Sequence, residues 1–354
     1  MIKVLFSLIC FWALQAAASD FPASVSRALK EAAIPLAATA LWVQEVDAAK
    51  PRLAWNERES MNPASTMKLV TTYAALDLLG PAYVWKTEAF AQGVMSDGVL
   101  SGDLYLRGGG DPKLTYEQFG RLLRQIRGRG IKDIRGDLVI DRSAFEISSV
   151  DPGKFDAKPM RPYNVAPDAL LLNFKATTLQ LIPDPEKHAV TVITEPVSSN
   201  LDVLNKMSLG NGKACGDWRE RLRADVFSRG EMMRIVLTGV FPQACGERYW
   251  SMAVQDHPQY VLGVFRQLWA ELGGTLTGGL REGGVPDEAL AVAVLPSPTL
   301  AEVVRDTNKF SNNVMARQIF LTLGMEAGQR PATPQGSDAA IRSWLDARGI
   351  SIPE

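Results

Sequence analysis

A serine and a lysine three residues apart stand in the stretch NPASTMKL, residues 62–69. From Ser65 onward, apolar residues recur at helical spacing, which predicts a helix ending at Gly80. Residues three apart share one face of a helix, so the amine of Lys68 would lie beside the hydroxyl of Ser65. A neutral amine can take the proton of a serine, and the positive end of a helix favours the oxyanion of acyl transfer. The pair therefore predicts a nucleophile, Ser65, and its base, Lys68.

The same four letters also describe an ordinary helix start, with Ser65 as the N-cap and Lys68 on the surface. A second stretch, Ser311–Asn313, favours catalysis, because a hydroxyl and an amide over an active serine can relay a proton and hold a substrate amide. The pattern Ser-x-Asn recurs at 198–200. That copy lies among predicted strands, whereas Ser311 opens an apolar-periodic segment, so we interpret 198–200 as a chance match.

Motifs of several other classes are absent. The sequence has two histidines, His188 and His257, and no H-E-x-x-H, which argues against a zinc peptidase. It has no G-x-S-x-G elbow and no G-x-x-x-x-G-K-[ST] loop, which disfavours an α/β-hydrolase and a P-loop nucleotide site. We expect the glycine-rich stretch 107–112 to be a turn and His257 to be a loop or core residue. We predict no metal and no cofactor.

The N-terminus has the layout of a cleaved secretory signal over residues 1–19. A lysine precedes an apolar run at 4–14, and small residues follow it, with cleavage expected near Ala18. The run is shorter than the roughly 20 residues of a membrane helix, so a retained anchor is the less favoured alternative. No later stretch is long and apolar enough to span, and we predict an exported protein. Export to an oxidising compartment favours a disulfide between Cys215 and Cys245, over the alternative of two buried free thiols.

The 354 residues are 46% hydrophobic, enough for more than one core. A net charge of −1 gives no indication of a nucleic-acid partner. Helical patterns occupy 20–85 and 295–354, whereas 86–294 is rich in strands and turns. We therefore predict an α+β, multi-domain protein. One domain, 20–85 and 295–354, is interrupted by a strand-rich inserted region, 86–294, made of two nested subdomains.

The motifs Ser65–Lys68 and Ser311–Asn313 resemble the first two signatures of the serine penicillin-recognising enzymes. The longer strings NPASTMKLVTTYAALDLLG, LYLRGGGDPKLT, PYNVAPDALLLNF and NKFSNNVMARQ are similar to class C, low-molecular-mass penicillin-binding proteins, from about residue 21 to the end. The resemblance implies a periplasmic D-alanyl-D-alanine carboxypeptidase or endopeptidase. Its catalytic domain would hold an antiparallel sheet with helices on both sides.

The resemblance also implies roles and partners. Ser65 would attack the penultimate D-alanine carbonyl of a peptidoglycan stem peptide, Lys68 would activate it, and Ser311 would relay the proton to the leaving D-alanine. Asn313 would hold the substrate amide. Asp156 would bind the free amino group of diaminopimelate, although a plain surface aspartate is an equal alternative. A β-lactam would acylate Ser65 and remain there.

The sequence departs from this family at its third signature, because no Lys-Thr-Gly follows Ser311. We expect the chain to be a fragment or a truncated product, with an exposed sheet edge and an unfilled core. The alternative function is a catalytically inactive, peptidoglycan-binding remnant. A β-lactamase is less favoured because of the long insertion.

Overall fold

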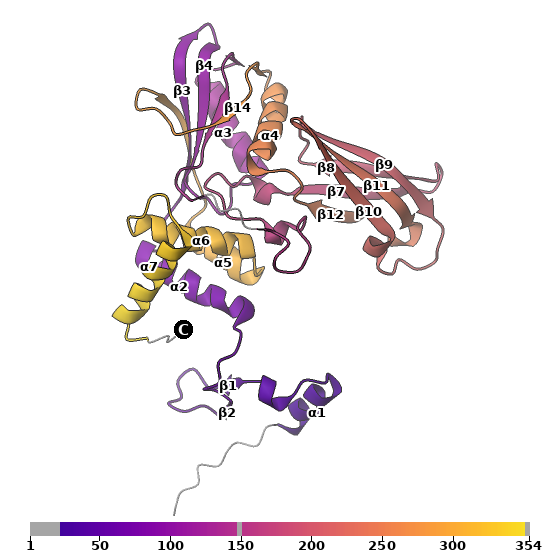
Figure 1. The fold of residues 1–354 in the computed structure, drawn as a ribbon, viewed down its shortest axis with the longest axis vertical. Coiled ribbons are helices and arrows are strands. Elements are labelled where there is room, and N and C mark those ends of the chain that lie inside the picture. Colours follow the sequence, from indigo (N-terminus) through magenta and orange to yellow (C-terminus); the bar gives the residue numbers. More distant parts are fainter. Residues whose placement is uncertain (1–21, 147–150, 351–354) are drawn as a thin grey trace, which may run out of the picture. The chain divides into compact units, whose positions relative to one another are not determined.

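The computed structural model describes residues 22–146 and 151–350 (Figure 1). The secretory signal predicted at 1–19 therefore lies outside the described residues. The chain forms two compact units, which divide between Ala64 and Ser65. Within the described residues, the structure contains no helix long and apolar enough to cross a membrane.

The N-terminal unit holds a short helix and a two-stranded hairpin. Strands β1 and β2 pair antiparallel, with Leu41 opposite Trp55. The elements are α1 (Ala23–Glu31), the 3-10 helix η1 (Leu36–Ala38), β1 (Leu41–Val43) and β2 (Leu53–Trp55).

Four helices of the second unit pack around a common apolar core. Two indole N–H groups find acceptors at its edges: Trp85 donates to Thr322 at 2.8 Å, and Trp344 donates to Asp77 at 2.8 Å. Such bonds let large aromatic residues be buried without leaving a polar group unpaired. The core includes Ala74, Ala75, Trp85, Leu300, Val303, Met315, Ile319 and Trp344. The helices are α2 (Met67–Leu79), α5 (Leu300–Lys309), α6 (Asn313–Glu326) and α7 (Pro334–Ala347).

A mixed sheet lies within residues 86–296, in the order β13-β5-β4-β3-β15, with β6 between β4 and β14. The long β3–β4 hairpin turns at Asp97 and Gly98, which both have positive φ, as this tight turn type requires. Helices α3 and α4 pack on the sheet, with Phe119 against Phe265. The elements are β3 (Lys86–Ser96), β4 (Val99–Gly108), α3 (Tyr116–Gly128), β5 (Asp133–Ile134), β6 (Leu138–Asp141), α4 (His257–Glu271), β13 (Thr275–Leu276), β14 (Leu280–Glu282) and β15 (Leu290–Pro296).

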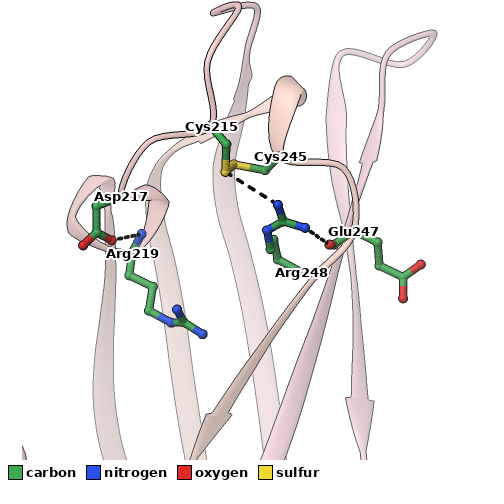
Figure 2. Close-up of a disulfide and its surroundings, with 6 residues drawn as sticks. All are labelled: Cys215, Asp217, Arg219, Cys245, Glu247 and Arg248. Carbon is green, nitrogen blue, oxygen red and sulfur yellow. Dashed lines mark hydrogen bonds between the residues drawn. A yellow bond between two sulfur atoms is a disulfide. The ribbon is translucent and has the colours of Figure 1, made fainter.

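Two three-stranded sheets, β12-β7-β8 and β10-β11-β9, enclose a separate apolar core around Trp218. The predicted disulfide joins Cys215 to Cys245 at one end of these strands (Figure 2). The elements are β7 (Thr177–Asp184), β8 (Ala189–Glu195), β9 (Leu201–Gly210), η5 (Trp218–Arg221), β10 (Leu222–Arg229), β11 (Met232–Pro242), η6 (Gln243–Cys245) and β12 (Arg248–Met252).

A buried polar cluster joins the mixed sheet to helix α6. The amide of Gln318 donates to the carbonyls of Asp168 and Gly110, at 2.8 and 3.2 Å, and accepts from the Asp168 N–H at 2.9 Å. The Asp168 carboxylate pairs with Arg142, which also donates to Glu282 of β14 at 2.6 Å. A buried amide that satisfies three backbone groups fixes the two layers to each other.

Two smaller sequence predictions can be compared with the structure, one of them correct only in part. Of the stretch 107–112, residues 107 and 108 still belong to β4, and residues 109–112 lie in the connection to α3. Gly108 lies so close to the Ala169 backbone that a side chain would collide with it. His257 is buried at the start of α4, and its Nδ1 lies 3.7 Å from Asp168. Burial lowers the pKa of His257 to about 4, so it is a neutral core residue at neutral pH.

The fold is α+β with several sheets, as predicted. The predicted boundaries of the strand-rich region are 85/86 and 294/295. The first falls at the start of β3 and the second falls inside β15. The division into one interrupted domain with two nested subdomains stays a prediction.

Asp111, in the turn after β4, provides a test of this packing. Its carboxylate accepts the Lys113 N–H at 2.7 Å, and burial raises its pKa to about 6. The native state therefore binds a proton more tightly than the unfolded chain, and stability falls as pH rises from about 4 through 6. We predict that Asp111→Asn stabilises the fold at pH 8, by up to about 3 kcal/mol, and that the gain disappears below pH 4. Thermal unfolding at both pH values measures it, with the exposed Asp287→Asn as the control. An equal gain at both pH values would contradict this account.

Candidate active site

The amine of Lys68 stands at the centre of the predicted site. Lys68 is buried on α2, with 9% of its surface exposed. Its Nζ lies 3.0 Å from Ser65 Oγ, 3.3 Å from Ser311 Oγ and 2.7 Å from Asn313 Oδ1. The structure therefore brings together four of the residues that the two sequence motifs predict.

Ser65 lies in a short 3-10 helix, η2 (Ala64–Thr66), directly before α2. The α-helix thus begins at Met67, two residues later than the sequence pattern predicts. The spacing of three still places the Ser65 hydroxyl beside Lys68, because a 3-10 turn also brings residues i and i+3 together. The alternative of an exposed lysine is wrong for Lys68.

The connection between α5 and α6 presents Ser311 and Asn313 to the lysine. Ser311 has φ of 51°, a strained conformation for a residue with a side chain. Asn312 is the N-cap of α6 and accepts the N–H groups of Val314 and Met315, each at 3.0 Å. Asn313 then begins the helix. The capping residue therefore leaves its two neighbours free to face Lys68.

A second bond holds this connection against α2. Asn308, near the end of α5, donates to the hydroxyl of Thr72 at 3.1 Å. Thr72 in turn donates to the backbone carbonyl of Lys68 at 2.8 Å. Because Thr72 is one turn after Lys68, the bond fixes α5 to the same turn of helix that carries the amine.

The surroundings of Lys68 favour its neutral form. Desolvation by burial lowers the pKa of the amine, and the positive charge of Arg317 lowers it further. Arg317 is one turn after Asn313 on α6 and donates to the carbonyl of Val165 at 3.4 Å. Both effects increase the share of neutral amine at a given pH, and only the neutral amine can accept a proton.

A pocket of about 570 Å³ opens beside Ser65. This volume is within the range of small-molecule sites. Its walls combine the polar residues that the sequence predicts to be catalytic with apolar side chains and one serine from strand β12. The lining residues are Ser65, Pro162, Tyr163, Phe174, Ala176, Ser251, Phe310, Ser311, Asn312, Asn313 and Val314.

Asp156 does not line this pocket, but it contacts Tyr163, which does. Its carboxylate accepts the Tyr163 hydroxyl, the Asn164 amide at 2.8 Å and the Lys158 N–H at 3.0 Å. The hydroxyl of Tyr163 is the main reason that the pKa of Asp156 is lowered. Tyr163 and Asn164 belong to the 3-10 helix η3 (Pro162–Asn164). Asp156 is thus one hydrogen bond away from the pocket.

The second Ser-x-Asn copy has a different environment. Ser198 donates to Asn200 at 2.8 Å, and both residues are buried. Asn200 also accepts from Gln255 at 2.8 Å and donates to the carbonyl of Gln259 at 2.9 Å. These bonds tie the strands to α4, which gives the copy a structural role.

Several residues of the site were not predicted from the sequence. Thr72 and Arg317 lie one helical turn after Lys68 and Asn313, so helical spacing was a usable signal for them. Tyr163 and Ser251 reach the pocket through tertiary packing alone, and no local pattern points to them. Among the described residues, no group of His, Cys, Asp and Glu side chains could hold a metal ion.

Comparison with known proteins places this geometry in a family. Residues 21–354 match the D-Ala-D-Ala carboxypeptidase 3 (S13) family. The chain is 25% identical over 296 residues to the D-alanyl-D-alanine carboxypeptidase DacB of Haemophilus influenzae, covering 84% of this chain and 61% of that protein. It is 26% identical over 308 residues to a D-alanyl-D-alanine carboxypeptidase of an Actinomadura species, covering 83% and 56%. The chain therefore spans about three fifths of the length of these relatives.

The fold is similar to that of a solved structure, penicillin binding protein 4 (dacB) of Haemophilus influenzae. The TM-score is 0.71 at 24% identity, covering 86% of this chain and 66% of that one. A second structure of that protein, complexed with a β-lactam, gives a TM-score of 0.65. The likeness supports the predicted multi-domain, penicillin-recognising fold.

The bond between Tyr163 and Asp156 predicts a measurable shift in pKa. We expect Tyr163→Phe to raise the pKa of Asp156 toward its ordinary value, because the variant removes the hydroxyl that stabilises the carboxylate. Carbon NMR of protein labelled at the aspartate carboxyl groups measures the pKa, with Asp156→Asn to assign the signal. Tyr249→Phe is the matched control, since Tyr249 bonds to a different carboxylate. An unchanged pKa in the Tyr163 variant would show that this bond does not govern Asp156.

Proposed function

The chain belongs to the D-Ala-D-Ala carboxypeptidase 3 (S13) family, and from its site we propose that it is a serine D-alanyl-D-alanine carboxypeptidase and endopeptidase acting on peptidoglycan stem peptides. One observation supports this proposal above the others. A single buried amine, that of Lys68, lies within hydrogen-bond distance of Ser65, Ser311 and Asn313.

Acylation follows from these contacts. The neutral amine of Lys68 accepts the Ser65 Oγ proton through its lone pair, while it donates to Asn313. Ser65 Oγ then bonds to the carbonyl carbon of the penultimate D-alanine, and the Ser65 N–H is one donor to the oxyanion. Ser311 passes the proton from the Lys68 amine to the nitrogen of the leaving residue, and the C–N bond breaks. Water then attacks the ester of the acyl-enzyme, which releases the shortened peptide and restores the Ser65 hydroxyl.

The pocket supports a stem peptide as the substrate. The amide of Asn313 at its edge suits the substrate amide, and its apolar wall suits an aliphatic side chain. Asp156, a carboxylate held ionised by Tyr163, suits the free amino group of diaminopimelate. A β-lactam with the shape of the terminal dipeptide would acylate Ser65. We propose a periplasmic location, supported by the signal pattern at 1–19 and by the disulfide.

The proposed function predicts release of D-alanine from a stem pentapeptide that contains diaminopimelate. We expect Ser65→Ala to abolish release, because the variant removes the hydroxyl that would form the acyl-enzyme. We expect Asp156→Asn to lower kcat/KM about tenfold for this peptide, yet to change it little when the side-chain amino group is acetylated. D-alanine is measured with a coupled oxidase assay. Wild-type protein that is folded but releases no D-alanine would favour the inactive, peptidoglycan-binding remnant.

Arg317 predicts the pH dependence of the acylation step. Its charge lowers the pKa of Lys68, so we expect Arg317→Gln to raise that pKa and reduce the neutral amine at a given pH. The acidic limb of the acylation rate by a fluorescent penicillin would then move to higher pH, with a fall of about three- to tenfold at pH 7. Arg317→Lys keeps the charge and is the matched control. If the acidic limb of the pH profile did not move in Arg317→Gln, the charge of Arg317 would not govern the pKa of Lys68.

A further inference from the structure

The pocket beside Ser65 continues onto the outer face of the sheet β12-β7-β8. Ser251 of β12 lines the pocket and stands opposite Thr178 of β7, with their hydroxyl oxygens 2.8 Å apart. Thr178 in turn stands opposite Glu195 of β8. These three side chains form a polar row across the three strands, and the row begins in the pocket.

A second row, with two polar side chains and the exposed apolar Ile193, lies two residues further along the strands. Gln180 stands opposite Tyr249 and Ile193. Its amide donates to Glu247 at 2.7 Å, and the Tyr249 hydroxyl donates to the same carboxylate oxygen. Tyr249 is 54% exposed. The hydrogen bonds therefore hold an aromatic ring and a carboxylate in fixed positions on the surface.

The alternation of the strands shows that this face points outward. Leu179, Trp250 and Val192, which alternate with the two rows, lie in or against the core between the two sheets. Figure 2 shows the same alternation at the start of β12: the Glu247 carboxylate points away from the disulfide, whereas Arg248 reaches back toward Cys215 Sγ, 4.0 Å away.

The face is also attached to the catalytic half of the site. The N–H of Ala253, one residue after β12, donates to the carbonyl of Met160 at 2.9 Å. Met160 lies just before η3, which carries Tyr163. At the other end, the disulfide from Cys245 to Cys215 holds the residues that lead into β12. The strand is thus held at both ends beside the pocket.

The chemistry of this face suits a neutral, hydroxyl-rich ligand. It offers hydroxyls, an amide, an exposed aromatic ring and two carboxylates, and the outward positions of the described strands β7, β8 and β12 carry no lysine or arginine. Carboxylates at 195 and 247 disfavour an acidic peptide by charge repulsion. Acceptors for hydroxyl groups beside an aromatic ring suit a sugar, whose apolar C–H face can pack on the ring.

We propose that the outer face of β12-β7-β8 is a subsite for the neutral sugar units to which the stem peptide is attached. This proposal rests on the proposed function and names a further part of its substrate. The length of the stem peptide allows its sugar to reach this face, because about four extended residues between the reacting carbonyl and the sugar span at most about 14 Å. Along the strand, the two-residue spacing from Ser251 to Tyr249 adds about 7 Å.

The first test compares two substrates that share one pentapeptide, free or attached to its disaccharide. We expect the wild-type kcat/KM for D-alanine release to be about tenfold higher with the sugar. In Tyr249→Ala and Gln180→Ala this ratio falls toward one. Phe227→Ala, which removes an exposed aromatic ring on β10, is the control and keeps the wild-type ratio. A wild-type ratio of one, or a ratio unchanged in both variants, overturns the proposal. Equal losses for both substrates would assign the face to the peptide and overturn it as well.

A second test does not depend on turnover. Binding of chitotetraose, a neutral sugar without peptide, is followed by saturation-transfer NMR. We expect binding by the wild type and Phe227→Ala, and its loss in Tyr249→Ala. Sugar binding without D-alanine release would retain this subsite while rejecting the proposed function. No binding by the wild type would overturn the subsite.

Discussion

The site depends on the burial of one amine. Lys68 Nζ makes its three contacts with residues from two segments that are more than 240 positions apart in the chain. Burial of the amine lowers its pKa, which increases the share of the neutral form that could serve as a base. The same contacts set the distances between the proposed nucleophile, the proposed hydroxyl relay and the amide. Geometry and proton affinity therefore arise from one packing arrangement.

The rest of the second unit keeps α6 and α2 in that arrangement. Thr72 and Asn308 join α5 to the turn that carries Lys68. Gln318 ties α6 to the backbone at Gly110 and Asp168. The strand-rich residues 86–294 are thus connected to the helix that begins with Asn313, and their strand β12 adds a wall to the pocket. This part of the chain therefore contributes to the site.

Much of this could be predicted from the sequence, for identifiable reasons. Helical spacing placed Lys68 beside Ser65, and the change of periodicity separated helical ends from a strand-rich middle. The start of α2 was misplaced by two residues, because a 3-10 turn and an α-helix carry the same apolar pattern at their junction. Tyr163, Ser251 and the Asp168 cluster could not be predicted, since each acts through contacts between distant segments. The strain at Ser311 likewise depends on how two helices meet.

The central claim is that Ser65 is a nucleophile activated by Lys68, and one measurement tests it most directly. The intact mass of the protein is recorded before and after exposure to benzylpenicillin, followed by peptide mapping. The account predicts one penicilloyl adduct per chain, located on the peptide that contains Ser65 and absent when Lys68 is replaced by alanine. A folded protein with no adduct, or an adduct on another residue, would contradict it.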